Sequence, residues 1–536
     1  MGPLLSEGIS IDTSPINARD AGQLRKVLDS FGEKKYDVIF FSPFSHARLP
    51  ELEALLDGSR GLSSGKEIDE LLDAVIVKTK SLIDMIADRF ECPIYIHNAS
   101  KTRRAGSVLK AFAGGLICQR PRARAKNRLN RWLYDALAAK NDATFRHLFV
   151  LDEARIARSA RGYRAGLYLH SSQFQHATVL SQALAVEYQV RIATVARLLG
   201  RKLIVCDLDN TIWDGVIGDG PVSHFLDRQR VLKRLKDEGG VVLSIASKND
   251  PTNVHFTNGL LTEVDFVAPQ ISWNAKSKAI SVIKKQLNLQ TKHMVFLDDP
   301  PDERAMVQEA HPEMLVLDPT DVVVWERLGL WADLVAGSSD LDRTLLYQQQ
   351  LERDRLAKSS EEASTGPDVE ALTKLGLTIK VREASKNDLK RVVELINRTN
   401  QWNMCGSRTT FEQVRSWHES DDAVVLLGGA ADRFGDMGTV CIAVLTVDAD
   451  AAQIPVFVLS CRVFGYGVET AVFRDISRRC LARKRNRLLG KYRETQQNHP
   501  GRDMYADHGF RKLDGDFEWS CTDSLPEIPW AVVKSK

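Results

Sequence analysis

Short apolar runs alternate with longer amphipathic stretches over roughly the first two thirds of the chain. In residues 1–198 these runs predict buried strands, and residues 71–90 place apolar side chains at the spacing of a helix. The expected strands are 36–41, 92–97 and 147–152. Strands that alternate with helices are typical of an α/β layered domain, and a long helix over 175–200 is expected to close it.

Residues 199–345 repeat this alternation and predict a second α/β domain with a parallel sheet. Its expected strands are 203–207, 241–247, 265–269 and 294–299. Residues 346–376 are polar, with Ser, Gly and Pro near their middle, and predict a helical linker. From there to residue 536 the strands are longer and set against helices, which indicates a third domain over 377–536.

Composition narrows the class of protein. Lys and Arg number 73 against 70 Asp and Glu, and the net charge of +3 offers no general attraction for nucleic acid. No apolar stretch approaches the roughly 18 residues of a membrane span, and the N-terminus lacks a signal-peptide pattern. The 8 cysteines form no CxxC pair. We therefore expect reduced thiols and a cytoplasmic protein without a membrane partner.

Polar residues mark the ends of the apolar runs in the second domain. They are the segment Asp207-Leu208-Asp209-Asn210-Thr211, Ser247, Lys276 and the pair Asp298-Asp299. Open parallel sheets carry their sites at the carboxyl ends of their strands. Carboxylates that hold a metal, a carboxylate nucleophile, and a hydroxyl and an ammonium that neutralise a phosphate are the groups that phosphoryl transfer requires.

Each of these residues taken alone is better explained as a cap of the following helix. The four features together, in this order, favour phosphate chemistry and resemble the haloacid-dehalogenase superfamily. The resemblance implies that Asp207 is the nucleophile and Asp209 the acid/base, and that Thr211, Ser247 and Lys276 bind phosphate. It further implies a Mg²⁺ site made by Asp207, Asp298, Asp299 and the backbone carbonyl of Asp209.

Only short segments occupy the places where this superfamily inserts its cap domains. A core without a large cap leaves its site open, so another domain or a partner protein is expected to close it. This points away from a free-standing phosphatase of small molecules.

A glycine-bearing turn between a strand and a helix stands out in the third domain, in residues 456–476. Arg462, Gly465 and Gly467 have the spacing RxxGxG, which lets backbone N–H groups approach a phosphate at a helix N-terminus. Together with Asn498 and Tyr505 in "NHPGRDMYADHGF", this turn resembles the acetyltransferase fold of the GNAT superfamily. The resemblance implies that these five residues hold a pantetheine arm.

Cys461 directly precedes Arg462, at the expected end of a strand and beside a helix N-terminus. Positive potential there favours a thiolate. A buried strand cysteine is the structural alternative, and taken alone it explains the residue better.

Six motifs in order resemble the FkbH-like family over residues 175–520, in which a haloacid-dehalogenase core is fused to an acyltransferase-like domain. They are "DLDNTIWDGVIGDG", "ASKND", "FLDDPPDER", "TNQWN", "DRFGDMG" and "SCRVFGYGVE". The resemblance implies a glyceryltransferase/phosphatase that uses Mg²⁺ and takes D-1,3-bisphosphoglycerate. It also implies that the glyceryl group is loaded onto an acyl carrier protein for polyketide or tetronate-type biosynthesis, with Cys461 carrying the acyl group.

Two features depart from the family pattern. Pro300 stands where the family usually has Asn, and it removes an N–H beside the acidic pair. The loop after Gly220 is also shorter than usual.

Residues 1–198 are similar to a degenerate SGNH-hydrolase fold but lack its nucleophile and DxxH motifs, so we expect a scaffold or docking domain. His97 and Asn98 at a strand end are better explained as satisfied structural residues than as ligands. The basic runs 120–131 and 482–493 are either solvated helix faces or docking sites for an acidic carrier. No aromatic residues interleave with their charges, which disfavours nucleic acid.

Two other functions remain open from the sequence. One is a Mg²⁺-dependent phosphatase fused to a coenzyme A-dependent N-acyltransferase, which does not need a thiol at residue 461. The other is a non-enzymatic scaffold, which the intact carboxylates disfavour.

Overall fold

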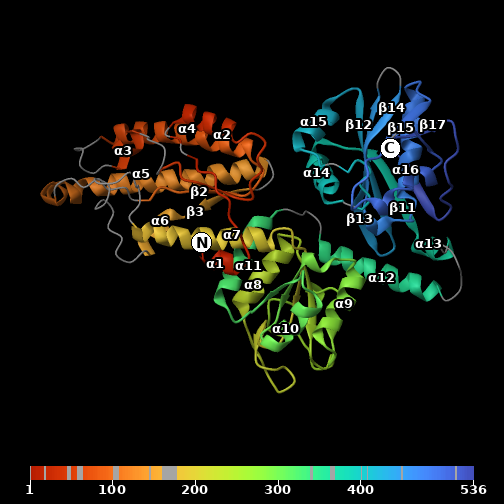
Figure 1. Ribbon diagram of the computed structural model, residues 1–536, viewed down its shortest axis with the longest axis horizontal. Helices are drawn as coiled ribbons and strands as arrows, with labels where there is room; N and C mark the ends of the chain where they lie inside the picture. Colours follow the sequence, from red (N-terminus) through yellow and green to blue (C-terminus); the bar gives the residue numbers. More distant parts are fainter. Residues whose placement is uncertain are drawn as a thin grey trace. The chain divides into compact units, whose positions relative to one another are not determined.

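The computed structural model of the chain forms two compact units, Met1–Thr344 and Leu345–Lys536 (Figure 1). The structure describes residues 2–16, 18, 20–44, 50–56, 64–100, 108–143, 147–159, 178–337, 342–361, 369–399, 401–406, 408–447, 451–513 and 516–535. Within this part, no helix has both the length and the apolar character needed to cross a membrane.

The first unit begins with a three-stranded parallel sheet of order β1-β2-β3, as the apolar runs predict. Its strands are β1 (Ile39–Phe41), β2 (Ile94–His97) and β3 (Leu148–Leu151). The helices of this region are α1 (Gly2–Ser6), α2 (Ala21–Ser30), α3 (Pro50–Leu56), α4 (Gly65–Arg89), α5 (Val108–Ala143), α6 (Glu153–Ser159) and α7 (Thr178–Leu198). Apolar residues of α2, α4 and α5 form one core with the sheet, and residues of α6 and α7 form a second.

A five-stranded parallel sheet of order β10-β9-β4-β7-β8 forms the rest of this unit. Its strands are β4 (Leu203–Cys206), β7 (Val242–Ser247), β8 (Gln270–Ile271), β9 (Met294–Leu297) and β10 (Leu315–Leu317). The helices are α8 (Leu226–Asp237), α9 (Lys276–Leu287), α10 (Pro301–Ala310) and α11 (Val322–Val335). The sheet confirms the expected parallel α/β core, and a small hairpin, β5 (Trp213–Asp214) and β6 (Ser223–His224), follows β4.

The strand expected over 265–269 is the main local difference. The chain forms a 3-10 turn at Glu263–Asp265, closed by a capping box with Thr262, and makes a single bridge from Phe266 to Leu243. The short strand β8 begins only at Gln270. The apolar residues are buried as expected, but the turn caps compete with the strand ladder.

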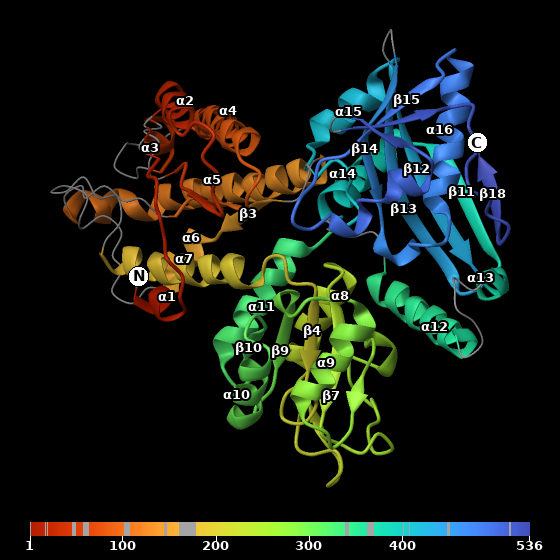
Figure 2. The ribbon, with the colours of Figure 1, turned by 45° about the vertical axis from the view of Figure 1, so that its right-hand side comes forward.

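The second unit is built on a mixed eight-stranded sheet of order β16-β17-β15-β14-β13-β12-β11-β18 (Figure 2). Its strands are β11 (Leu377–Glu383), β12 (Ala423–Asp432), β13 (Gly435–Val447), β14 (Ala452–Leu459), β15 (Arg487–Lys491), β16 (Arg511–Lys512), β17 (Asp516–Ser520) and β18 (Ala531–Ser535). The helices are α12 (Arg343–Glu361), α13 (Val369–Leu375), α14 (Leu389–Arg398), α15 (Phe411–Glu419), α16 (Val468–Ala482) and α17 (Met504–Asp507).

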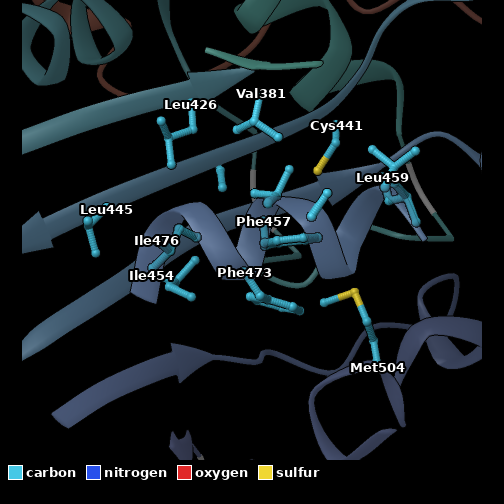
Figure 3. Close-up of a cluster of buried hydrophobic side chains, with 14 of the residues drawn as sticks. Val381, Leu426, Cys441, Leu445, Ile454, Phe457, Leu459, Phe473, Ile476 and Met504 are labelled. Atoms are coloured by element: carbon cyan, nitrogen blue, oxygen red, sulfur yellow. The ribbon is translucent and has the colours of Figure 1, made fainter. Parts of the chain in front are cut away.

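Alternation along the strands gives this sheet two apolar faces. Helices α14 and α15 pack on one face, and α16 packs on the other. Figure 3 shows the core under α16, where Phe457 and Phe473 lie face to face with ring centroids 4.8 Å apart.

Strands β14 and β15 run parallel but pair over only three residues of each, Ala452–Ile454 with Leu488–Gly490. Beyond that point the edge of β14 is covered by the chain's own segment Trp402–Met404. The Leu459 N–H donates to the Trp402 carbonyl at 2.9 Å, and the Met404 N–H donates to the Phe457 carbonyl at 2.9 Å.

The other side of this segment is also bonded, because the Arg493 N–H donates to the Met404 carbonyl at 2.9 Å. Residues 402–404, which contain the last two residues of the "TNQWN" motif, are therefore inserted between β14 and the residues that follow β15.

Helix α12, in the expected linker, is attached to this unit by a buried ion pair. Arg353 donates to both carboxylate oxygens of Asp432, at 2.6 and 2.9 Å, and the two side chains are 3% and 0% exposed. Asp432 also accepts from the Phe434 and Gly435 N–H groups. This gives the "DRFGDMG" motif a structural role, since its aspartate anchors α12.

Candidate active sites

The polar strand ends of the five-stranded sheet meet at one place. Strand β4 lies between β9 and β7, with Cys206 opposite both Leu297 and Ile245. Asp207, the next residue, donates its N–H to the Leu297 carbonyl at 2.9 Å. The carboxyl ends of β4 and β9 therefore bring Asp207 beside Asp298, at the point where the strand order reverses.

Three carboxylates converge there, since Asp207, Asp298 and Asp299 each place an oxygen within 4.8 Å of the others. Asp207 is 5% exposed and Asp298 is 0% exposed. Oδ1 of Asp207 and Oδ2 of Asp298 are buried without a hydrogen-bond partner in the described part of the chain. Oxygen donors of this kind fit Mg²⁺, and the orphaned atoms leave coordination sites for it.

Lys276, the first residue of α9, supplies a positive charge to this group. Its Nζ lies 2.7 Å from Asp298 and 3.1 Å from Asp207. Burial lowers the pKa of this ammonium, but the two carboxylates outweigh it and the net shift is upward. Burial and the Asp207 charge raise the pKa of Asp298 despite Lys276, because one cation does not balance three carboxylates.

Asp209 is held apart from this carboxylate group by three donors. Its Oδ1 accepts from the Trp213 Nε1–H at 2.7 Å and from the Ile217 N–H at 3.1 Å, and its Oδ2 accepts from Asn249 Nδ2 at 2.9 Å. The side chain is therefore fixed and does not join the cluster. A backbone carbonyl contribution to a metal site stays a prediction.

The two hydroxyls expected at the site lie at the ends of β4 and β7. Thr211 is 0% exposed, and its Oγ1 has no partner in the ranges described above. Ser247 is 3% exposed, and its Oγ accepts from Asn249 Nδ2 at 3.3 Å. Asn249 thus links the expected acid/base to an expected phosphate-binding hydroxyl.

Like Asn249, Arg304 on α10 contacts the site in a way that the sequence does not reveal. Its Nη1 donates to the carbonyls of Asp298 and Asp299, and its Nη2 donates to Asp318 at 2.7 Å. Both Asn249 and Arg304 lie inside quoted motifs, "ASKND" and "FLDDPPDER", but their partners become visible only in three dimensions. Pro300 is the N-cap residue of α10.

The RxxGxG segment joins β14 to α16. Cys461 starts a 3-10 turn (Cys461–Val463) two residues after β14, and its side chain lies outside the described part of the structure. Gly465 and Gly467 have φ of +81° and +85°, in the left-handed region, and Gly467 is the N-cap of α16. Arg462 Nε donates to Ser460 Oγ at 3.2 Å. Positive φ at both glycines explains the spacing of the motif.

Asn498 is fully buried, and its side chain bonds three backbone groups. Its Nδ2 donates to the Asn403 and Arg493 carbonyls, both at 2.9 Å, and its Oδ1 accepts from the Thr495 N–H at 2.8 Å. Asn498 therefore fastens the inserted segment Trp402–Met404. A direct contact with a pantetheine arm stays a prediction.

Tyr505 is also fully buried, with its ring 5.3 Å from that of Phe517 and packed closely on Gly490. A Cβ on Gly490 would lie 2.4 Å from the Tyr505 ring. Burial raises the pKa of the Tyr505 hydroxyl well above its ordinary value. The residue is therefore part of the core, and its predicted contact with pantetheine also stays a prediction.

His97 is satisfied on both ring nitrogens, as expected for a structural residue. Its Nδ1 lies 2.7 Å from Glu153, and its Nε2 lies 2.7 Å from the Tyr188 hydroxyl. The Asn98 side chain donates to Asp152 at 2.8 Å.

The two basic runs differ in structure. Residues 120–131 lie within helix α5, although the side chains of 120–122 are outside the described set. Residues 482–493 span the end of α16 and strand β15, where Lys491 pairs with Asp516 at 2.6 Å. The second run is therefore not a single helix face.

Comparison with known proteins finds no matching family model and no matching curated protein. Among solved structures, the N-terminal part of protein BF1531 from Bacteroides fragilis, which contains a phosphatase domain complexed with Mg, is 20% identical. It covers 59% of this chain and 84% of its own, with a TM-score of 0.40.

Several other solved structures each match about a quarter of this chain. The GNAT domain of S. lividans PAT is 18% identical over 26% of this chain and 89% of its own, with a TM-score of 0.22. The Escherichia coli ribosomal-protein-S18-alanine N-acetyltransferase is 11% identical over 27% and 96%, with a TM-score of 0.23.

Proposed function

We propose that this chain is a two-centre enzyme that takes D-1,3-bisphosphoglycerate, removes its phosphate groups and loads the glyceryl group as a thioester onto an acyl carrier protein. The observation that carries the proposal is the buried group of Asp207, Asp298, Asp299 and Lys276 at the switch point of a parallel sheet. Uncompensated carboxylates are costly in a core, so their convergence favours a role in chemistry.

Asp207, Asp298 and Asp299 would hold a Mg²⁺ ion through their orphaned and converging oxygens. When bound, this ion supplies positive charge that neutralises a phosphate and the nucleophile beside it. The Bacteroides fragilis phosphatase domain of similar fold was crystallised with Mg.

The protein's own residues would divide the phosphatase work. Asp207 is the nucleophile, because its Oδ1 is free of protein donors in the described structure. Lys276, Ser247 and Thr211 bind the phosphate. Asp209, held in position by its three donors, gives a proton to the leaving oxygen and later takes one from the attacking water.

The acyl phosphate end of the substrate needs no further activation. A thiolate at Cys461 would attack its carbonyl carbon, forming a C–S bond and releasing phosphate as the C–O bond breaks. The pantetheine thiol of the carrier would then take the glyceryl group, and the proton of that thiol would return to Cys461.

A coenzyme A-dependent N-acyltransferase joined to the phosphatase is the second candidate, since the RxxGxG turn and the GNAT-like fold suit it too. The two candidates differ at residue 461, because only the first needs a thiol there.

Intact-mass analysis of a phosphopantetheinylated carrier protein tests the proposal. The full chain, MgCl2 and D-1,3-bisphosphoglycerate should add a glyceryl mass to the carrier. Asp207→Asn should abolish release of the ester phosphate, and Cys461→Ala should abolish loading. The control Cys405→Ala should load normally, and an unmodified carrier with the wild-type enzyme would contradict the proposal.

A further inference from the structure

Glu469 is a buried carboxylate to which neither proposed centre assigns a role. It lies in the first turn of α16, directly after the RxxGxG turn, and is 9% exposed. Its Oε2 is buried without a hydrogen-bond partner among the described residues. An unpaired carboxylate in a protein interior is destabilising, so its presence calls for a reason other than stability.

Gly428 on β12 allows the turn of α16 that carries Glu469 to pack closely on the sheet. A Cβ at Gly428 would lie 2.9 Å from Cβ of Cys441, 3.0 Å from Val472 and 3.1 Å from Val468. Only glycine lets the first turn of α16 approach the sheet this closely. Figure 3 shows Cys441 on the face of the sheet that α16 covers. The close packing removes water from Glu469.

The turn of α16 that carries Glu469 packs beside Cys441, on the strand that pairs with β14. Burial raises the pKa of the Cys441 thiol, and the charge of Glu469 adds to this effect. Cys441 is directly opposite Leu459, the last residue of β14, and the Ser460 N–H donates to the Val440 carbonyl at 2.7 Å. Cys461 is the residue that follows Ser460 in the chain.

Several charged groups on the elements around α16 are paired with other residues. The described pairs are Asp432 with Arg353, Glu383 with Arg479, Arg487 with Glu518 and Lys491 with Asp516, and His508 bonds Thr470. No cation is paired with Glu469 in the described ranges, and burial raises the pKa of its carboxyl to about 7. Near neutral pH it can therefore both accept and donate a proton.

We infer that Glu469 is the proton shuttle of thioester transfer at the end of β14; this inference rests on the proposed function. In the second half-reaction the pantetheine S–H gives its proton to the Glu469 carboxylate as its sulfur attacks the thioester carbon. The C–S bond to Cys461 breaks, and Glu469 returns the proton to the leaving thiolate. Proton and electron pairs balance, and the carboxylate is regenerated.

Glu469→Gln in the full chain tests this role, with carrier loading followed by intact mass and stability by thermal unfolding at pH 8. We expect loading to fall by about 10²–10⁴-fold. Hydrolysis of p-nitrophenyl phosphate should be unchanged, because the Asp207 centre is intact. The unfolding midpoint should not fall, since the variant removes an unpaired buried charge.

Glu394→Gln is the matched control, because Glu394 is a largely buried carboxylate that pairs with Arg391 and Arg398. It should lower the unfolding midpoint and leave loading unchanged. Normal loading by Glu469→Gln, or reduced loading together with an equal loss of stability, would overturn the shuttle while the proposed function stands. Failure of the wild-type enzyme to load the carrier would overturn both.

Discussion

Replacing Lys276 by Met tests whether one buried ammonium holds the carboxylate group together. The side chain is 4% exposed and contacts Asp298 and Asp207, whose side chains are also buried. Met keeps much of the volume but leaves the carboxylates unbalanced. Removing one partner of a buried ion pair typically costs about 3–5 kcal/mol. For a domain of this size, that corresponds to a drop of roughly 6–20 °C in midpoint.

Divalent metal should reverse much of this loss. With Lys276→Met, the group loses the ammonium that contacts it, so the stabilising effect of Mg²⁺ should exceed that on the wild type. A metal at 100 times its Kd adds about 2.7 kcal/mol. Thermal unfolding followed by tryptophan fluorescence, in EDTA and in MgCl2, measures both effects, because Trp213 and Trp331 are buried in the core of this domain.

Lys278→Met supplies the matched control, since it removes the same charge from the same helix at an exposed position. It should change stability by no more than about 0.5 kcal/mol. Equal midpoints for Lys276→Met and wild type in EDTA would refute the reasoning, as would a Mg²⁺ effect no larger than that on the wild type.

Three further outcomes are expected. Because the pKa of Glu469 is raised from 4.5 to about 7, its ionisation destabilises the fold progressively between these values and fully above them. Glu469→Gln should therefore match the wild type near pH 4.5 and exceed it by about 3 kcal/mol at pH 8, and a difference that does not depend on pH would contradict this. Arg353→Met should lower the midpoint of the second unit by an amount equivalent to about 3–5 kcal/mol, whereas the exposed Arg355→Met should not. Asn249→Ala should reduce phosphate release by roughly 10–100-fold at unchanged unfolding midpoint, and undiminished release would exclude a positioning role for this amide.

The sequence predicts the parallel sheet and the meeting of its polar strand ends, because strand-end position alone decides which edge Asp207 and Asp298 occupy. It does not predict their supporting contacts. Asn249 reaches Asp209 across 40 positions of sequence, and such a contact leaves no local pattern. The prediction of a strand at 265–269 is wrong because hydrophobic periodicity indicates burial only. The backbone conformation there is set by the capping box that Thr262 forms with the 3-10 turn.

In the third domain, too, the sequence predicts a local feature but not the contacts between distant residues. The glycine spacing predicts the RxxGxG turn correctly, since positive φ is a local requirement. Burial of Asn498 and Tyr505 depends on the divergence of two strands and on the segment inserted between them. No local pattern reports either feature.

The inserted segment Trp402–Met404 makes three distant stretches of sequence interdependent. The Trp402 ring stacks on Phe464 of the glycine turn, with centroids 4.2 Å apart, and a Cβ on Gly501 would lie 2.5 Å from Met404. Substitutions in these stretches should therefore covary among related chains. A chimera that exchanges only one of them would join surfaces that no longer fit, so engineering of this domain has to move all three as a single cassette.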